Sequence, residues 1–239
     1  SRAQRYEQTH HGLHGSTSEL PAANSNRFQR IKESSLATYY LIRHGTTAWV
    51  DRQLLHGVTD IPLNDNGLRQ AAKTAAALKG LRVQHLLSSP LSRAMQTAEL
   101  IGQAVGLTPE PRAGLIEINF GWMEGKQIHD DTMGDHSILQ EKIDHYWLSL
   151  IRLVSGESLN RFRKRVINEW NAILNSLPDE DAIIVCHSGV LTAILEYCFG
   201  NAYRGSKPYY ITHPCSITEI KTVDNRCYQL VRLNDHSHL

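Results

Sequence analysis

From residue 36 onward, short apolar runs alternate with longer segments in which apolar residues recur every three or four positions. The short runs predict buried strands at 37–42, 85–88, 182–186, 217–223 and 228–233. The longer segments predict helices at 68–78, 90–105, 159–177 and 190–199. Strands that alternate with helices indicate an α/β fold, here a three-layer α/β/α sandwich with a mostly parallel central sheet and one antiparallel edge.

Residues 1–35 differ from the rest of the chain, because they are rich in Ser, Gln, Asn, Arg and His and show no sustained period. We expect a disordered or weakly ordered tail there and assign it no function. Its histidines, His10, His11 and His14, have no acidic or cysteine residue as an obvious partner, which favours a solvated tail over a metal site. Residues 36–239 form the predicted domain, and 118–155 is interpreted as a helical, lid-like insertion within it.

Composition excludes several classes of protein. The 239 residues are 41% hydrophobic and 21% charged, with a formal net charge of +1, as in an ordinary globular protein. Near-neutral charge argues against a nucleic-acid or polybasic membrane protein, and no apolar run reaches the roughly 18 residues of a bilayer span. We expect a cytoplasmic protein that binds a small molecule, with no nucleic-acid and no membrane partner; a homodimer stays open. The sequence starts at Ser1 without a methionine, which leaves a removed targeting peptide open.

The cysteines give no sign of a metal site. They are separated by 12, 17 and 12 residues, at Cys186, Cys198, Cys215 and Cys227. This spacing matches neither a zinc site nor a dense disulfide framework. We therefore expect reduced, mostly buried thiols.

Two histidines, His44 and His187, each follow a predicted buried strand. Ends of parallel strands meet at one edge of a sheet, where open α/β sheets bind their ligands. A single histidine there is more often a hydrogen-bonded structural residue. Arg43, Arg93 and Glu117 change this interpretation, because arginine pairs and imidazoles suit a phosphoryl group with its anionic oxygens.

The motifs around these residues resemble those of the histidine phosphatase, or phosphoglycerate mutase-like, superfamily. The first is the run Leu41-Ile42-Arg43-His44-Gly45-Thr46-Thr47-Ala48-Trp49. Further matches follow in the family's order, at His56-Gly57, Asp60-Ile61-Pro62-Leu63, Gly67, Gln70-Ala71, Ser88-Ser89-Pro90-Leu91-Ser92-Arg93-Ala94, Thr97-Ala98, Glu117-Ile118-Asn119-Phe120-Gly121, Glu124-Gly125, Gly156-Glu157-Ser158 and His187-Ser188-Gly189. The resemblance covers residues 38 to about 239 and implies a phosphoglycerate mutase-like fold.

The resemblance implies catalytic roles for three residues. His44 would attack phosphorus and become phosphorylated, and Glu117 would protonate the leaving alkoxide and later deprotonate water. A protonated His187 would donate to the phosphoryl group from the opposite side, and the resemblance implies neither a metal nor another cofactor. The phosphate-binding residues that the resemblance implies are Arg43, Arg93, His187, Gly45, Thr47 and Ser188. Glu124 is the rival carboxylate, but Glu117 stands four residues before Gly121, as in the family's motif.

Three positions depart from the family's pattern. Thr46 stands where many members have a glutamate, and Val50 where they have an asparagine, so the second layer of phosphate contacts is expected to differ. Thr192 falls near the place of an arginine, so a contact to a distal acid of the substrate is expected to be missing.

The leading expectation is a metal-independent phosphomonoesterase that acts through a phosphohistidine on a small metabolite, with a sugar or nucleotide-like phosphate among the options. Six acids against three bases in 118–155, together with Trp122, Tyr146 and Trp147, disfavour bisphosphorylated acids. The chain also ends directly after the last predicted strand, and we expect no C-terminal cover over a phosphohistidine, as a mutase requires. Two alternatives stay open: a cofactor-dependent phosphoglycerate mutase, and a catalytically silent module that binds a phosphorylated ligand.

Overall fold

The computed structural model describes most of the predicted domain. The described ranges are 37–127, 156–200, 212–224 and 227–239. The predicted tail, residues 1–35, lies outside them, as do residues 128–155 of the predicted insertion. The domain boundary and the lid-like insertion therefore stay predictions.

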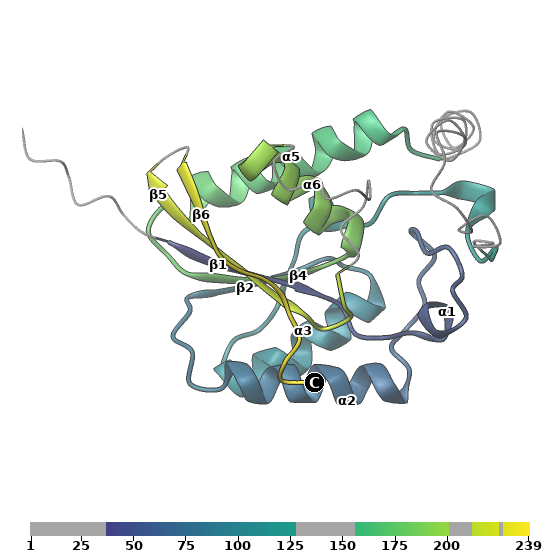
Figure 1. Ribbon diagram of the computed structural model, residues 1–239, viewed down its shortest axis with the longest axis horizontal. Helices are drawn as coiled ribbons and strands as arrows, with labels where there is room; N and C mark the ends of the chain where they lie inside the picture. The colour runs from purple at the N-terminus through teal and green to yellow at the C-terminus, as the bar shows by residue number, and fades with distance from the viewer. Residues whose placement is uncertain (1–36, 128–155, 201–211, 225–226) are drawn as a thin grey trace, which may run out of the picture. The chain divides into compact units, whose positions relative to one another are not determined.

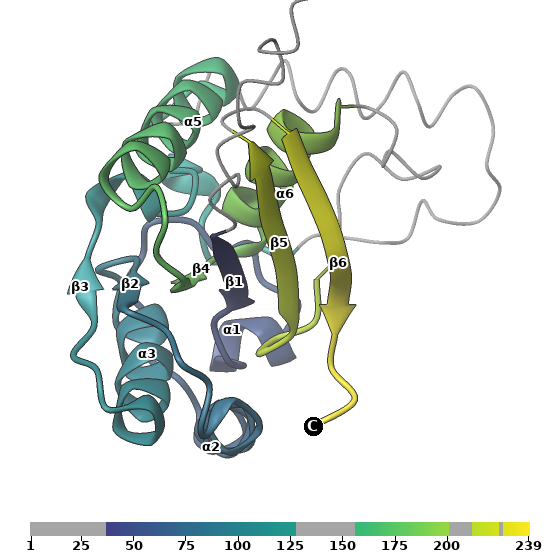
Figure 2. The ribbon, with the colours of Figure 1, turned by 90° about the vertical axis from the view of Figure 1, so that its left-hand side faces the viewer.

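Within the described ranges, six strands form one sheet (Figure 1), in the order β3-β2-β4-β1-β5-β6 (Figure 2). The strands are β1 (Thr38–Arg43), β2 (His85–Ser88), β3 (Glu110–Pro111), β4 (Ala182–Cys186), β5 (Ile217–Asp224) and β6 (Cys227–Asp235). The pairs β1/β4, β2/β4 and β2/β3 are parallel, whereas β5 pairs antiparallel with both β1 and β6. The predicted antiparallel edge is confirmed.

Helices cover both faces of this sheet. They are α1 (Ala48–Asp51), α2 (Asp65–Leu78), α3 (Ser92–Val105), α5 (Leu159–Ser176) and α6 (Ser188–Phe199), with 3₁₀ turns at Ala113–Leu115 and Gly121–Met123. Figure 2 shows α2 and α3 on one face and α5 and α6 on the other, as the two main core clusters also require. The predicted three-layer sandwich is confirmed.

The central strands separate two apolar layers. On β4, Ile183 and Val185 pack toward α2 and α3, whereas Ile184 packs toward α5 and α6. The apolar stripe predicted on the helix at 159–177 is buried in the second layer, at Phe162, Val166, Trp170 and Ile173. Because β4 is buried on both faces, His187, the polar residue that follows it, marks the edge of the core.

The predicted start of the helix at 90–105 is wrong. The helix expected to begin at Ser89-Pro90 begins at Ser92, and its N-cap residue Leu91 makes no side-chain cap. Asp60 caps it instead, because its carboxylate accepts from the Ser92 N–H at 2.7 Å and from the Ser92 hydroxyl at 2.6 Å. A cap from another loop has no local sequence signal, which explains the error.

Three smaller features also differ from the predictions. The predicted loop 46–66 contains α1, which Thr47 caps by accepting from the Val50 N–H at 3.2 Å. The two-residue strand β3 is too short for periodicity to reveal. The helix expected at 190–199 begins at Ser188.

The remaining expectations of the composition concern thiols and membranes. Cys186 and Cys215 are buried free thiols, as predicted, whereas Cys227 is exposed. Among the helices of the described ranges, none is long and apolar enough to cross a bilayer.

Candidate active site

The two strand-end histidines lie next to each other. β1 and β4 are neighbouring parallel strands in which Arg43 pairs with Cys186, so the residue after each strand reaches the same edge of the sheet. The backbone N–H of His44 donates to the Cys186 carbonyl at 3.0 Å, and the ring centroids of His44 and His187 are 5.1 Å apart. Both residues are buried, with exposed fractions of 3% and 1%.

The His44 ring is oriented by the backbone. Its Nδ1 lies 2.7 Å from the Gly45 carbonyl oxygen. A carbonyl only accepts, so we place the proton on Nδ1, which leaves the lone pair on Nε2. Burial lowers the pKa of His44 well below 6.5, and the charges of Arg93 and Arg43 lower it further. The ring is therefore neutral near pH 7, with Nε2 available as a nucleophile.

Backbone carbonyls hold the two arginines. Arg93 is fully buried and donates to the carbonyls of Gly57 and Thr59 at 2.7 and 2.9 Å. Arg43 donates to the Thr212 carbonyl. Burial lowers the pKa of both guanidinium groups, yet a guanidinium stays charged in proteins. Carbonyl partners fix these groups without neutralising them, so two positive charges lie beside the histidines.

His187 is oriented by Ser89, the residue that follows β2. The His187 Nε2 lies 2.8 Å from the Ser89 hydroxyl oxygen. Burial lowers the pKa of His187 well below 6.5, and Arg93 lowers it further. Without a phosphoryl group beside it, His187 is therefore neutral near pH 7, and the protonated His187 expected during phosphoryl transfer stays a prediction. A neutral imidazole still donates one hydrogen bond, and a phosphoryl dianion beside it would raise its pKa.

Three buried nitrogens of the cluster have no hydrogen-bond partner among the described residues: Nε of Arg43, Nε of Arg93 and Nδ1 of His187. Buried polar groups are normally paired, so unpaired donors at a sheet edge indicate where a ligand supplies acceptors. If the Ser89 hydroxyl donates to Nε2, the proton of the neutral His187 ring is on Nδ1. All three nitrogens are then donors, as a group with several anionic oxygens requires.

Glu117 lies at the N-terminus of α6. Its Oε2 accepts from the Gly189 N–H and its Oε1 from the Ile118 N–H, both at 3.0 Å. A Cβ on Gly189 would lie 2.4 Å from Glu117 Oε1, so the carboxylate occupies the space that a side chain would fill. Burial raises the pKa of Glu117 above 4.5, although the two amide bonds and both arginines oppose the shift. Such a carboxyl can exchange a proton closer to neutral pH than an exposed one.

Arg165 of α5, which the sequence analysis missed, anchors the loop that carries Glu117. Its guanidinium donates to the carbonyls of Gly114, Ile116 and Glu117 at 3.0, 2.7 and 3.3 Å. It also forms two hydrogen bonds to the Glu157 carboxylate, at 3.0 and 2.7 Å. Glu157 belongs to the Gly-Glu-Ser motif before α5, so that motif shapes the loop and not only the helix start.

Gly45 and Thr47 have their polar groups engaged within the fold. The Gly45 N–H donates to Thr97 Oγ1 at 3.1 Å, and a Cβ on Gly45 would lie 2.7 Å from the Gly67 carbonyl oxygen. The Thr47 hydroxyl caps α1 and lies 2.7 Å from His56 Nε2. The structure thus gives these two residues packing and capping roles, and their contacts to phosphate stay predictions.

Ser188 begins α6 next to His187. Its hydroxyl oxygen accepts from Thr212 Oγ1 at 3.3 Å, and its carbonyl accepts from Thr192 Oγ1 at 2.9 Å. Thr192 stands near the place of the family's arginine, and its hydroxyl is therefore bonded to a backbone carbonyl of α6. The phosphate contact of Ser188 stays a prediction.

His56 forms part of the wall beside His44, whereas the sequence analysis named it only as part of a motif and gave it no role. Its ring centroid lies 6.4 Å from that of His44 and 5.4 Å from that of Trp49. Nδ1 lies 3.1 Å from the Leu54 carbonyl, to which it donates, so Nε2 accepts from the Thr47 hydroxyl. Burial lowers the pKa of His56 to about 4. Both nitrogens of this neutral ring are used, which makes His56 a wall of the site and not a phosphate ligand.

Glu124, the rival carboxylate, is occupied by hydrogen-bond donors. It accepts from the N–H groups of Val58, Thr59 and Phe120 and from the Thr59 hydroxyl. Burial alone would raise its pKa, but these four hydrogen bonds outweigh burial and lower it below 4.5. A low pKa and full acceptor occupancy are wrong for a proton donor, so Glu124 is discarded as the acid.

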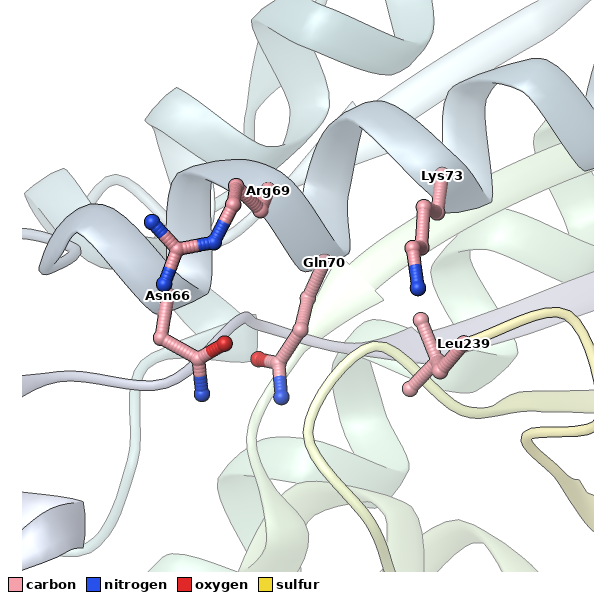
Figure 3. Close-up of a pocket in the computed structure, with 5 residues that line it drawn as sticks. All are labelled: Asn66, Arg69, Gln70, Lys73 and Leu239. Carbon is pink, nitrogen blue, oxygen red and sulfur yellow. The ribbon is translucent and has the colours of Figure 1, made fainter.

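A surface hollow on α2 is separate from this cluster (Figure 3). It is lined by Asn66, Arg69, Gln70, Lys73 and Leu239. The first four project from α2, and Leu239 lies beside Lys73 (Figure 3). The hollow shares no residue with the histidine and arginine cluster, so the buried cluster is the candidate active site.

Sequence comparison agrees with this geometry. The sequence model of the histidine phosphatase superfamily (branch 1) matches residues 39–236. The chain belongs to the histidine phosphatase superfamily. This membership confirms the resemblance found in the motifs, and the sheet described above is the phosphoglycerate mutase-like fold of its relatives.

Relatives within the histidine phosphatase superfamily carry names of two activities. A Yersinia pestis protein named "Probable phosphoglycerate mutase GpmB" is 29% identical over 181 residues, which cover 76% of this chain and 83% of that protein. The crystal structure of phosphoglycerate mutase from Bacillus anthracis has a TM-score of 0.72 and 25% identity, covering 86% of this chain and 96% of that one. The α-ribazole phosphatase from Shigella flexneri has a TM-score of 0.66 and 25% identity, covering 83% and 96%. One fold therefore serves both mutases and phosphatases.

Proposed function

We propose that the protein is a phosphomonoesterase that forms a phosphohistidine at His44 and hydrolyses it. The observation that carries this proposal is the convergence at one sheet edge of a neutral histidine, buried nitrogens that no described residue partners and a buried carboxyl group of raised pKa. Together they supply a nucleophile, donors for the phosphoryl oxygens and a proton donor, which are the parts that phosphoryl transfer through a covalent intermediate needs.

In the first step, Nε2 of His44 attacks phosphorus while the bond from phosphorus to the ester oxygen breaks. Arg43 and Arg93 stabilise the charge on the equatorial oxygens, and Nδ1 of His187 donates a further hydrogen bond. Glu117 gives its proton to the leaving alkoxide. The products are the free alcohol and phosphorylated His44.

In the second step, water attacks phosphorus and the bond from phosphorus to Nε2 of His44 breaks. Glu117, now a carboxylate, takes a proton from the attacking water. Inorganic phosphate leaves, and both residues return to their starting protonation states. Two guanidinium groups supply the positive charge that metal ions supply in other phosphoryl-transfer enzymes, so we propose no metal and no other cofactor.

Charge favours hydrolysis over mutase activity. Arg43 and Arg93 are the permanently charged groups that lower the pKa of both site histidines. Their two positive charges are enough to balance one phosphoryl dianion. The ammonium of Lys126 lies 3.1 Å from the ring centroid of Trp122, which gives it a partner of its own. A bisphosphorylated intermediate brings a second dianion, which needs further positive charge. Residues 118–155 contain six acidic residues and only three basic ones, which disfavours binding of that second dianion.

The substrate that suits this charge pattern is a small monophosphate with a ring or a sugar. Residues 118–155 contain aromatic side chains that can stack on a ring, at Trp122, Tyr146 and Trp147. The α-ribazole phosphatase of Shigella flexneri, 25% identical in sequence, has a similar fold. These features support a sugar or nucleotide-like phosphate as the substrate class.

A cofactor-dependent phosphoglycerate mutase is the second candidate. The observation that favours it is the 29% identity to the Yersinia pestis protein named for that activity. A mutase returns the phosphoryl group to its substrate, whereas a phosphatase gives it to water. The two functions therefore differ in product and can be separated in one assay.

The assay uses 3-phosphoglycerate with 2,3-bisphosphoglycerate, and p-nitrophenyl phosphate in parallel. We expect release of inorganic phosphate with little 2-phosphoglycerate, because the two guanidinium groups suit one phosphoryl group and not a bisphosphorylated intermediate. Isomerisation that runs well ahead of phosphate release would contradict the phosphatase and establish the mutase. If neither activity appears on these esters or on a panel of sugar and nucleotide monophosphates, the protein is a binding module.

A further inference from the structure

We infer that Glu124 is a positioning residue for Arg93: its carboxylate fixes the turn at residues 57–59, whose carbonyls hold the Arg93 guanidinium. The inference rests on the proposed function, because it concerns how the phosphate-binding arginine is aimed. It assigns a role to the carboxylate that was discarded as the proton donor.

Glu124 binds the turn from one side. Its Oε1 accepts from the Val58 N–H at 3.0 Å, and its Oε2 accepts from the Thr59 N–H at 2.7 Å and from the Thr59 hydroxyl. A Cβ on Gly57 would lie 2.0 Å from Glu124 Oε1, so the carboxylate sits directly against the backbone. The turn cannot shift without breaking hydrogen bonds to a charged group, which are the strong ones.

Arg93 binds the same turn from the other side. The carbonyls of Gly57 and Thr59 accept from its Nη2 and Nη1 at 2.7 and 2.9 Å. The Gly57 carbonyl and the Val58 N–H belong to one peptide unit. The N–H, the positive end of that peptide dipole, faces Glu124, and the carbonyl oxygen, its negative end, faces Arg93. A carboxylate and a guanidinium at opposite ends of one peptide dipole each strengthen the hydrogen bond of the other.

The turn is also tied at its far end. Asp60 accepts from the N–H and the hydroxyl of Ser92, the residue before Arg93. Arg93 thus receives its backbone position from α3 and its guanidinium position from the turn. The Nε of Arg93 stays without a partner within the described ranges and is a donor left for a ligand. Its direction depends on the two carbonyls, and therefore on Glu124.

Glu124 further connects this turn to the loop of the proton donor. Its Oε1 also accepts from the Phe120 N–H at 3.0 Å, three residues after Glu117. One carboxylate therefore sets the spacing between the arginine turn and the Glu117 loop. Loss of its charge is expected to loosen Arg93 first, because three of its four hydrogen bonds come from the turn.

The first test is a double-mutant cycle on p-nitrophenyl phosphate. Glu124→Gln keeps the size of the side chain but loses the charge and presents an NH₂ group to backbone donors. We expect kcat/KM to fall about tenfold or more, because a small misplacement of a binding group is costly. In an Arg93→Ala background the same change should alter kcat/KM by less than about twofold, since the group through which Glu124 acts is gone. Equal losses in the two backgrounds would overturn the inference.

The control for charge is Glu99→Gln on the exposed face of α3, which should leave kcat/KM unchanged. The second readout is the Kd of orthovanadate, measured by calorimetry beside the melting temperature. We expect Glu124→Gln to weaken vanadate binding about tenfold. A lower melting temperature with unchanged vanadate affinity would show a purely structural role and overturn the inference.

Thr59→Val decides the matter if Glu124→Gln fails to fold, because it removes only the hydroxyl donor to Glu124. We expect it to weaken vanadate binding by roughly threefold, because one of the hydrogen bonds between Glu124 and the turn at residues 57–59 is lost. Unchanged affinity in a folded Thr59→Val protein would overturn the inference. A wild-type protein that hydrolyses no phosphate ester overturns the proposed function instead. The vanadate measurements then still test whether Glu124 positions Arg93.

Discussion

His44→Ala should lower kcat on every phosphate ester by on the order of 10⁴-fold, because it removes the nucleophile on which both chemical steps depend. The Nε2 lone pair of the neutral ring has no substitute in alanine. Vanadate binding should persist, since Arg43, Arg93 and His187 remain. Steady-state turnover of p-nitrophenyl phosphate, with a melting curve to confirm folding, measures the effect.

His85→Ala is the matched control for that substitution. His85 lies in β2, a parallel strand of the same sheet, but its ring pairs with the Glu180 carboxylate at the surface. We expect its turnover to stay near the wild-type value. If a folded His44→Ala protein keeps more than about a tenth of wild-type turnover, the covalent mechanism is wrong.

Glu117→Gln should separate substrates by their leaving groups. For alkyl phosphates, kcat/KM should fall by about 10²- to 10³-fold, because the departing alkoxide needs a proton. For aryl phosphates the fall should stay below about tenfold, since a phenolate leaves without one. Water attack on phosphorylated His44 also loses its base, so aryl phosphates should give a burst of phenol equal to the enzyme present. Equal losses of kcat/KM on both classes would place the acid elsewhere.

The pH dependence provides a second test of Glu117. Its pKa is raised above 4.5 by burial, and the acid must be protonated for the first step. For alkyl phosphates, wild-type kcat/KM should therefore be high at pH values below this pKa and fall as the pH rises through it. Glu117→Gln cannot titrate and should lose this fall. The same alkaline limb in both proteins would contradict the assignment.

The position of the two histidines was predictable from the sequence, because it depends on backbone geometry alone. His44 and His187 each follow a continuous apolar run, and adjacent parallel strands bring their ends to one edge. The motifs added Arg93 and Glu117, and the structure brings these residues together with the histidines. Alternation of strands and helices was likewise enough for the layers of the fold.

The supports of the site were not predictable, because they are hydrogen bonds to backbone groups far away in sequence. Glu124 binds N–H groups some 65 residues earlier in the chain, and Arg165 binds carbonyls some 50 residues earlier. Neither pattern leaves a period or a short motif with an evident mechanism. The lowered pKa of the ligand-free His187 ring was not predictable either, because it depends on how many cations and how much burial surround the ring.

Trapping the intermediate tests the central claim most directly. The protein is mixed with a substrate that carries a labelled phosphoryl group, quenched in alkali during turnover, digested and mapped by mass spectrometry. We predict a label that is stable in alkali and labile in acid, bound to His44 and lost at the rate at which inorganic phosphate appears. Turnover with no protein-bound label above the His44→Ala background, or a label on another residue, would contradict the account.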